Sequence, residues 1–192
     1  MARPISFDRE KVLDIALGAF QETGFSNTGI ATLVEKMSLK PSSLYGAFSS
    51  KEGLFIEVLQ RYSSQSLVQI EQLLGSAGSP LAGVKALIAA VAQDAIACES
   101  HPGCLLVNTL LEVGRHHPAI QQATNAHLAE VEQLVTDTLR QAQVEGELSI
   151  NKDIEGTAAL LLTMIWGLRV LGRTNPTPGK VNTIVTQIQH YL

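Results

Sequence analysis

The sequence is poor in several features that would assign it to a class of protein at once. With only Cys98 and Cys104 it has no basis for a disulfide scaffold, and two free thiols are the default in a reducing compartment. The longest apolar run, residues 158–168, is well short of the roughly 20 residues that a membrane-spanning helix requires. The N-terminus has no apolar segment of the kind that a secretion signal needs. We therefore expect a cytoplasmic protein without a membrane partner.

An excess of positive charge is also missing. The formal net charge at pH 7 is -4, and residues 1–61 hold seven basic and seven acidic side chains, so this part of the chain is neutral. Such a balance argues against extensive binding to nucleic-acid phosphates. A neutral region still binds DNA when a few cations and oriented backbone amides face the phosphates, and few ionic contacts are then expected.

Aromatic residues make up 5% of the chain and charged residues 17%, whereas Ala, Leu and Val are abundant and regular alternation is rare. This composition favours an all-α fold. Apolar residues at helical spacing predict a first helix from Asp8 to Gly24, a second capped by Thr28, and a third that begins at Pro41. A capping box in "SSKE" (49–52) begins a long fourth helix. Further helices are expected at 80–99, 102–113, 118–145, 152–173 and 178–192, which makes about nine in all.

The third helix, "PSSLYGAF" at 41–48, is too short to be stable alone, because two turns of hydrogen bonds do not offset helix nucleation. Leu44 and Phe48 are expected to face inward, and the opposite face consists of small polar groups. Two helices joined by a tight turn, with a short polar second helix, form the helix-turn-helix that enters the major groove of DNA. The alternative is an ordinary packed corner of a helical bundle, in which Tyr45 would be a half-buried core residue.

Small hydroxyl groups at the start of this short helix can approach base edges closely and donate or accept hydrogen bonds there. Residues on either side would hold phosphates, helped by the backbone amides that follow Thr28 and Ser50. The groove-facing set is Lys40, Ser42 and Ser43, with Pro41 at the first helical position, and the phosphate set is Thr28, Tyr45 and Lys51.

Several spaced elements occur together in "VLDIALGAFQETGFSNTGIATLVEKMSLKPSSLYGAFSSKEGLF": a Gly-aromatic turn, a Thr-led helix, "SLY-x-x-F" and "SKE" before the long helix. In these elements residues 8–62 resemble the N-terminal domain of the TetR/AcrR family of bacterial transcriptional repressors. The resemblance implies a helix-turn-helix domain at 1–50, continuing into a linking helix at 50–74, and a helical effector-binding and dimerisation domain at 51–192. Ser38 stands where the family usually has glycine, so a positive φ there would be strained.

The resemblance further implies a homodimeric, ligand-responsive repressor that binds a palindromic operator and is released by a small-molecule effector, without a cofactor. In the family the effector binds among the C-terminal helices, and the last two helices form the dimer. Carried over, the effector site would include Tyr62, Cys104, Val107, Leu111, Met164 and Trp166. The dimer surface would include Leu160, Leu168, Leu171, Val181, Ile184, Val185 and Ile188, whose apolar side chains suit an interface or a core.

Two other functions stay open from the residues alone. A helical small-molecule carrier or interaction module would keep the cavity and the dimer helices without binding DNA. An enzyme would need catalytic residues, but the sequence has no nucleophile elbow, Walker sequence or metalloprotease signature, so we expect no enzymatic activity.

Cys104 has two interpretations. It would lie in the first turn of its helix, where the helix dipole lowers a thiol pKa and suits a sensor of oxidants or electrophiles. It would equally suit a small buried hydrophobe. Cys98, His101 and Cys104 form a C-x-x-H-x-x-C string, but residues 102–103 interrupt any single helix and no fourth ligand is evident, so we expect no metal site.

Overall fold

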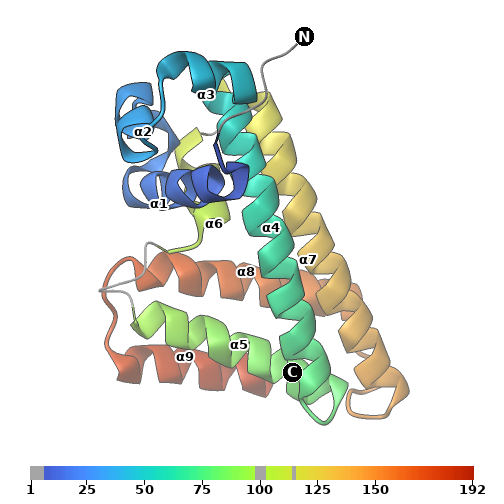
Figure 1. Ribbon diagram of the computed structural model, residues 1–192. Helices are drawn as coiled ribbons and strands as arrows, with labels where there is room; N and C mark the ends of the chain where they lie inside the picture. The colour runs from blue at the N-terminus through green and yellow to red at the C-terminus, as the bar shows by residue number, and fades with distance from the viewer. Residues whose placement is uncertain (1–6, 98–102, 114–115) are drawn as a thin grey trace.

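The computed structural model describes residues 7–97, 103–113 and 116–192 of the chain. Within these ranges the secondary structure consists of nine α-helices, which confirms the predicted all-α fold (Figure 1). In chain order they are α1 (Arg9–Asn27), α2 (Ile30–Lys36), α3 (Pro41–Phe48), α4 (Lys51–Ser76), α5 (Pro80–Ile96), α6 (Leu105–Val113), α7 (Pro118–Val144), α8 (Ile154–Gly172) and α9 (Pro178–Tyr191).

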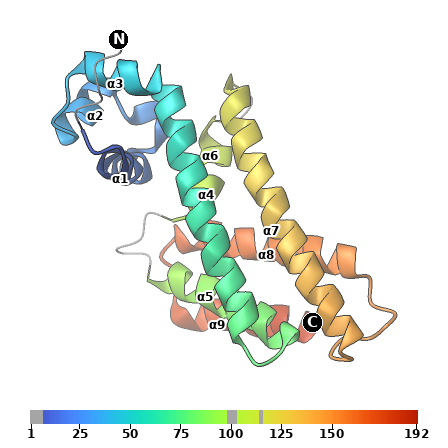
Figure 2. The same ribbon diagram turned by 45° about the vertical axis from the view of Figure 1, so that its right-hand side comes forward.

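The two long helices α4 and α7 pack against each other and run along the length of the molecule (Figure 2). The helices α1, α2 and α3 gather around the N-terminal end of α4, and we call these three the head (Figure 1). The helices α5, α8 and α9 pack together near the other end of α4, and we call α5–α9 the body. The short helix α6 lies between, in contact with α1, α7 and α8.

An aromatic cluster forms the centre of the head. The ring centroid of Phe55, on α4, lies 4.6 Å from that of Phe20 and 4.9 Å from that of Phe25, both on α1. Burying such a side chain contributes about 1.5–3 kcal/mol, and each aromatic pair adds about 0.5–1.5 kcal/mol. The same hydrophobic cluster continues through residues 104–107 to Val113 of α6, so that α6 packs into the base of the head.

The helix caps test the sequence interpretation closely. Asp8 caps α1 as predicted, since its carboxylate accepts hydrogen bonds from the amides of Glu10 and Lys11. The chain also leaves helical geometry at Gly24 as predicted, with φ of 80°. The prediction for Thr28 was wrong: Gly29 is the N-cap of α2, and no side chain caps that helix.

The caps around α3 also differ from the prediction by one residue. Ser50, and not Ser49, caps α4 by accepting a hydrogen bond from the amide of Gly53 at 2.9 Å. Ser49 instead ends α3 with φ of 64°, a left-handed conformation that allows a tight turn into α4. Ser38 has φ of 54°, which confirms that this serine adopts the backbone conformation usually taken by glycine.

Of the described helices, α8 is the one with the length and apolar composition to cross a membrane. A core helix passes the same test, so this is weak evidence for a membrane span. Of its apolar window, 39% is buried inside the molecule, and α8 packs against α5, α7 and α9.

Candidate functional site

The outward face of α3 is polar, and its inward face holds the helix in place. Leu44 and Phe48 are buried in the head core, with exposed fractions of 0% and 3%. Tyr45 is 47% exposed, so the alternative of a half-buried core tyrosine was wrong. The remaining predicted contacts on this helix are also at the surface: Lys40, Pro41 and Ser42 are exposed and Ser43 is half-buried. In Figure 1, α3 lies at the outer end of the head.

Three cations, one each on α1, α2 and α4, are already paired. Arg9 forms an ion pair with Glu57 at 2.6 Å, Lys36 pairs with Glu22 at 2.7 Å, and Arg61 pairs with Glu10 and Asp14. Each such surface pair contributes little to stability, but together they tie α1 to α2 and α4. Lys40, at the N-terminal end of α3, has no ion pair among the described residues and is therefore available for a phosphate or a base edge.

Lys51 has a different place from the one predicted. Its ammonium group donates hydrogen bonds to the carbonyl oxygens of Phe25 at 2.7 Å and Thr28 at 3.0 Å, and lies 4.4 Å from the centre of the Phe25 ring. Burial lowers the pKa of Lys51, and the carboxylate of Glu112 opposes that shift. Lys51 thus supports the turn between α1 and α2, which corrects the prediction that it holds a DNA phosphate.

Thr28 is likewise part of the scaffold. Its side chain is 1% exposed, and its hydroxyl forms hydrogen bonds with the Thr23 hydroxyl at 2.7 Å and with the Gly24 carbonyl oxygen. A buried hydroxyl with these partners does not face a phosphate, so the prediction for the Thr28 side chain was wrong. We call residues 24–29 the Gly24 turn. The side chains of Thr28 and Lys51 form hydrogen bonds to its carbonyl oxygens.

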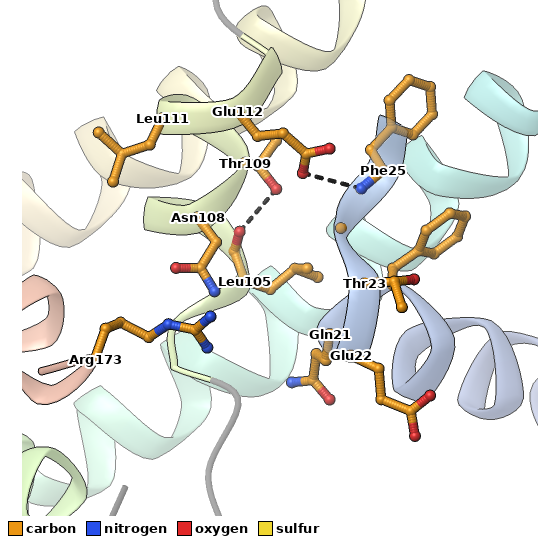
Figure 3. Close-up of a pocket in the computed structure, with 12 residues that line it drawn as sticks. Gln21, Glu22, Thr23, Phe25, Leu105, Asn108, Thr109, Leu111, Glu112 and Arg173 are labelled. Carbon is orange, nitrogen blue, oxygen red and sulfur yellow. Dashed lines mark hydrogen bonds between the residues drawn. The ribbon is translucent and has the colours of Figure 1, made fainter. Parts of the chain in front are cut away.

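A third support of the Gly24 turn comes from the body. Glu112, on α6, accepts hydrogen bonds from the backbone amides of Phe25 at 3.0 Å and Ser26 at 2.6 Å (Figure 3). A β-carbon at Gly24 would lie only 2.4 Å from Oε2 of Glu112, so the carboxylate needs a glycine there. Sequence reasoning missed this contact, because 87 residues separate Glu112 from Phe25 and nothing local to either residue predicts it.

The Glu112 contact lies beside a surface pocket of about 330 Å³ between the end of α1 and α6. Its lining is polar and apolar in similar measure, and the side chain of Arg173 points toward Asn108 (Figure 3). Leu111, which is 72% exposed, lines this pocket. The prediction that Leu111 belongs to an apolar effector site is therefore wrong, because it is on the outer face of α6.

An apolar cavity of about 40 Å³ lies inside the body and is lined from α4, α5, α6, α7 and α8. As it stands, this cavity has room for about one water molecule. It brings together three of the predicted effector residues, Cys104, Val107 and Trp166, whereas Met164 is half-buried and not part of the wall.

Tyr62 forms a hydrogen bond with Cys104, which lines this cavity, but Tyr62 itself is not part of the lining. Burial, together with the adjacent Cys104, raises the pKa of the Tyr62 hydroxyl, so the phenol remains protonated at neutral pH. Cys104 is 9% exposed and lies directly before α6, after Gly103 with φ of 80°. Cys98 and His101, the other members of the cysteine and histidine string, lie outside the described residues.

His127, on α7, also lines the cavity and is 4% exposed. Its Nδ1 atom is buried and forms no hydrogen bond within the described part of the chain. Burial lowers the pKa of His127, with Glu130 opposing the shift, so the ring is neutral at pH 7. Nothing in the local sequence around His127 indicates that this nitrogen lacks a partner.

The predicted dimer residues divide into two groups. Leu168, Val181 and Ile188 are at most 2% exposed and belong to the core of the body, so the prediction that they form an interface was wrong. They point inward because α8 and α9 cover α5. The others remain accessible: Leu160 is 41% exposed, and Leu171, Ile184 and Val185 are half-buried.

Comparison with known proteins agrees with this architecture. The family described as "Bacterial regulatory proteins, tetR family" matches residues 12–58, and "Tetracyclin repressor-like, C-terminal domain" matches residues 80–187. The HTH-type transcriptional repressor ComR of Escherichia coli strain K12 is 30% identical over 183 residues, which cover 95% of this chain and 87% of ComR. The HTH-type transcriptional regulator UidR of the same strain is 24% identical over 164 residues, covering 83% of this chain and 79% of UidR.

Among solved structures, a cysteine-substituted variant of the TetR family transcriptional regulator CifR, complexed with 26bp double-strand operator DNA, has a TM-score of 0.87. It shares 31% identity with this chain, and the match covers 98% of both chains. The resemblance noted in the sequence is thereby confirmed along nearly the whole chain. The chain belongs to the TetR family of bacterial transcriptional regulators.

Proposed function

We propose that this protein is a homodimeric transcriptional repressor whose α3 helices enter successive major grooves of a palindromic operator, and that a small molecule releases it. The exposed polar face of α3, held by buried Leu44 and Phe48, carries this proposal. It is supported by the operator complex of CifR, a relative of similar sequence. The protein would act in the cytoplasm, by binding and without catalytic turnover.

The structure changes the expected division of labour among the DNA contacts. Ser42 and Ser43 remain candidates for base edges, and Tyr45 for a phosphate. Lys40 gains importance, because Lys51 is engaged with carbonyl oxygens and Lys40 is the unpaired cation next to α3. The proposed head at 1–50 and the proposed effector and dimer part at 51–192 remain joined by α4, as the sequence suggested.

DNA binding is tested by fluorescence anisotropy with the region upstream of the protein's own gene. Lys40→Ala should weaken binding to all sequences and lower the salt dependence by about one unit of slope per subunit if it contacts a phosphate. Lys180→Ala, which removes an exposed cation at the far end of the molecule on α9, is the matched control and should leave binding unchanged. Ser42→Ala should instead change base preference. A wild-type protein that binds no fragment better than competitor DNA at low salt would favour the carrier or interaction module.

Dimerisation is proposed to use the exposed face of α8. Leu160 and Val170 are 41% and 44% exposed there, and small residues at 156, 159, 163 and 167 lie on the same exposed side. Close approach of two helices is favoured by such a face. Leu160→Glu should convert the dimer to monomers in light scattering at micromolar concentration, whereas Ile150→Glu, at an exposed position outside the helices, should not.

Release by an effector needs only modest coupling. A 100-fold loss of operator affinity corresponds to about 2.7 kcal/mol, within the usual range for allosteric coupling. The cavity lies where it could act on the head, because α6 lines the cavity through Leu106 and Val107 and contacts the Gly24 turn through Glu112.

A thiol-dependent response is the second candidate, and the proximity of Cys104 to Tyr62 favours it. Its 9% exposure argues for slow reaction in the resting state. Mass spectrometry of the native protein after brief treatment with iodoacetamide decides the point: rapid labelling of Cys104 with loss of operator binding supports sensing, and protection of Cys104 supports a packing role.

A further inference from the structure

The internal cavity contains a polar atom that has nothing to bind. Nδ1 of His127 is buried and has no hydrogen-bond partner among the residues that the structure describes, and the ring lines the cavity. A buried polar atom without a partner costs about 1–3 kcal/mol, so such atoms are rare in folded proteins. A neutral imidazole nitrogen either donates or accepts, depending on the tautomer. A hydroxyl group on a ligand satisfies it in both cases.

Besides His127, the wall has the hydroxyl of Ser66, the thiol of Cys104 and one charged side chain, and its other residues are apolar. The described lining contains no carboxylate, and its single charged group is Arg169, whose side chain is 25% exposed. Arg169 contacts Asp94 at 3.5 Å, a longer distance than a well-formed guanidinium and carboxylate pair. Apolar contacts would come from Leu87, Val91, Val131, Leu162, Ile165 and Trp166.

Arg169 also lines a surface groove of about 590 Å³ between α4 and α5. This groove and the internal cavity share Ser66 and Ile70 from α4 and Leu87 and Val91 from α5. Arg169 therefore lies at the boundary between the two. The cavity alone is too small for a metabolite, but cavity and groove together have the size usual for a small-molecule site.

We propose that the cavity and the groove together bind a small monocarboxylate with an apolar body and a hydroxyl group. The carboxylate binds Arg169 in place of Asp94, the body lies among the apolar side chains, and the hydroxyl meets Nδ1 of His127. The planar guanidinium is suited to bind a carboxylate with two hydrogen bonds, and the Asp94 contact shows that Arg169 already lies beside one. Binding of this ligand does not depend on the proposed function, but its role as an effector rests on it.

Binding would have a direct route to the head. To open the cavity, the ligand must separate Ser66 and Ile70 of α4 from the α5 side chains that share the lining. The other end of α4 carries Lys51, which holds the Gly24 turn. The same cavity is lined by the start of α6, whose last turn carries Glu112. Lys51 and Glu112, two of the three side chains that support the Gly24 turn, thus lie on helices that the ligand would displace.

Isothermal titration calorimetry on the DNA-free dimer tests the ligand class with three related probes. The probe para-hydroxyphenylpropionate carries both groups, phenylpropionate lacks the hydroxyl, and para-ethylphenol lacks the carboxylate. We expect the first to bind at least tenfold more tightly than either of the others. Equal affinity for all three, or no binding of any at millimolar concentration, would overturn the proposal.

Two variants separate the contacts. Arg169→Gln should weaken both carboxylates at least tenfold and spare para-ethylphenol, whereas His127→Leu should weaken the two hydroxylated probes and spare phenylpropionate. Arg140→Gln, on the exposed side of α7, is the matched control and should change none of them. If Arg169→Gln does not fold, Arg169→Lys keeps the charge without the planar fork, and unaltered carboxylate binding to it would overturn the role of the guanidinium.

The titrations need no DNA, so their failure is distinct from failure of the proposed function. A protein that binds its operator but none of the probes would overturn the ligand class alone. A protein that binds the probes as expected but no operator would support the site and remove its regulatory role.

Discussion

The Gly24 turn and the internal cavity lie at opposite ends of α6, and they differ in how their polar groups are satisfied. At the turn, Glu112 binds two amides, Lys51 binds two carbonyl oxygens, and Thr28 is bonded on the inside. In the cavity, Nδ1 of His127 has no hydrogen-bond partner in the described part of the chain. A fully satisfied network rigidifies its surroundings, whereas an unsatisfied polar atom favours a conformation in which it finds a partner. The Gly24 turn is thus expected to keep one conformation, whereas the cavity is expected to change conformation when His127 finds a partner.

Gly24→Ala should destabilise the Gly24 turn, and the whole protein, more than any other substitution considered. Alanine at φ of 80° costs about 1–2 kcal/mol, and the new β-carbon would expel the Glu112 carboxylate and its two charge-assisted hydrogen bonds. We expect a loss of about 3–5 kcal/mol in the free energy of unfolding, measured by urea denaturation. Gly18→Ala, in the same helix with open space around it, should instead stabilise by about 0.5–1 kcal/mol. An equal change in the free energy of unfolding for both variants would contradict the role of the Glu112 contact at the Gly24 turn.

Glu112→Gln removes the charge and keeps the shape. The neutral amide oxygen accepts weaker hydrogen bonds from the amides of Phe25 and Ser26, so we expect a loss of about 1–2 kcal/mol in the free energy of unfolding. The head should also be held less firmly, which faster hydrogen exchange of those two amides would report. Glu71→Gln, at an exposed position on α4, should change stability by less than about 0.5 kcal/mol and serves as the control.

His127→Leu should have the opposite sign. An apolar side chain of similar size removes the unpartnered nitrogen, and such a replacement is expected to be neutral or to stabilise by about 1 kcal/mol. A loss of more than about 1 kcal/mol in chemical denaturation would mean that His127 is satisfied in solution. The two ends of α6 would differ most clearly if His127→Leu raised the free energy of unfolding while the substitutions at the Gly24 turn lowered it.

Local patterns in the sequence were sufficient for the helices and for the orientation of α3. Leu44 and Phe48 are spaced to share one face of a short helix, so their burial and the exposure of Tyr45 followed from the helical period. Caps were less reliable: the capping-box pattern favoured Ser49, which has Glu52 three residues later, whereas the neighbouring Ser50 caps α4 through the amide of Gly53.

The contacts between distant segments were beyond such patterns. Lys51 and Thr28 have the chemistry of phosphate ligands, and only the folded chain reveals that carbonyl oxygens already engage them. Leu168, Val181 and Ile188 are as apolar as the accessible Leu160, so composition alone could not separate core from interface. Glu112 carries no local signal at all, since its partners are supplied by the turn of another helix.

The pH dependence of stability should also reveal the cavity histidine. Burial lowers the folded-state pKa of His127 below the unfolded value of 6.5, so the unfolded chain binds more protons in the window below that pH. Stability should therefore fall as the pH drops through this window, by at most about 1.4 kcal/mol per pH unit from this residue. Burial is the larger cause of this shift, and the carboxylate of Glu130 opposes it.

The measurement is the difference in unfolding free energy between wild type and His127→Leu, by urea denaturation at several pH values from 7.5 to 5.0, a range chosen to bracket the 6.5 reference value. Taking the difference removes the titration of all groups that the two proteins share. We expect the variant to gain relative to wild type as the pH falls, because it has no imidazole to protonate. A difference in unfolding free energy that stays constant with pH would mean that the His127 ring is solvated. The polar groups of the cavity would then be satisfied, as those of the Gly24 turn at the other end of α6 are.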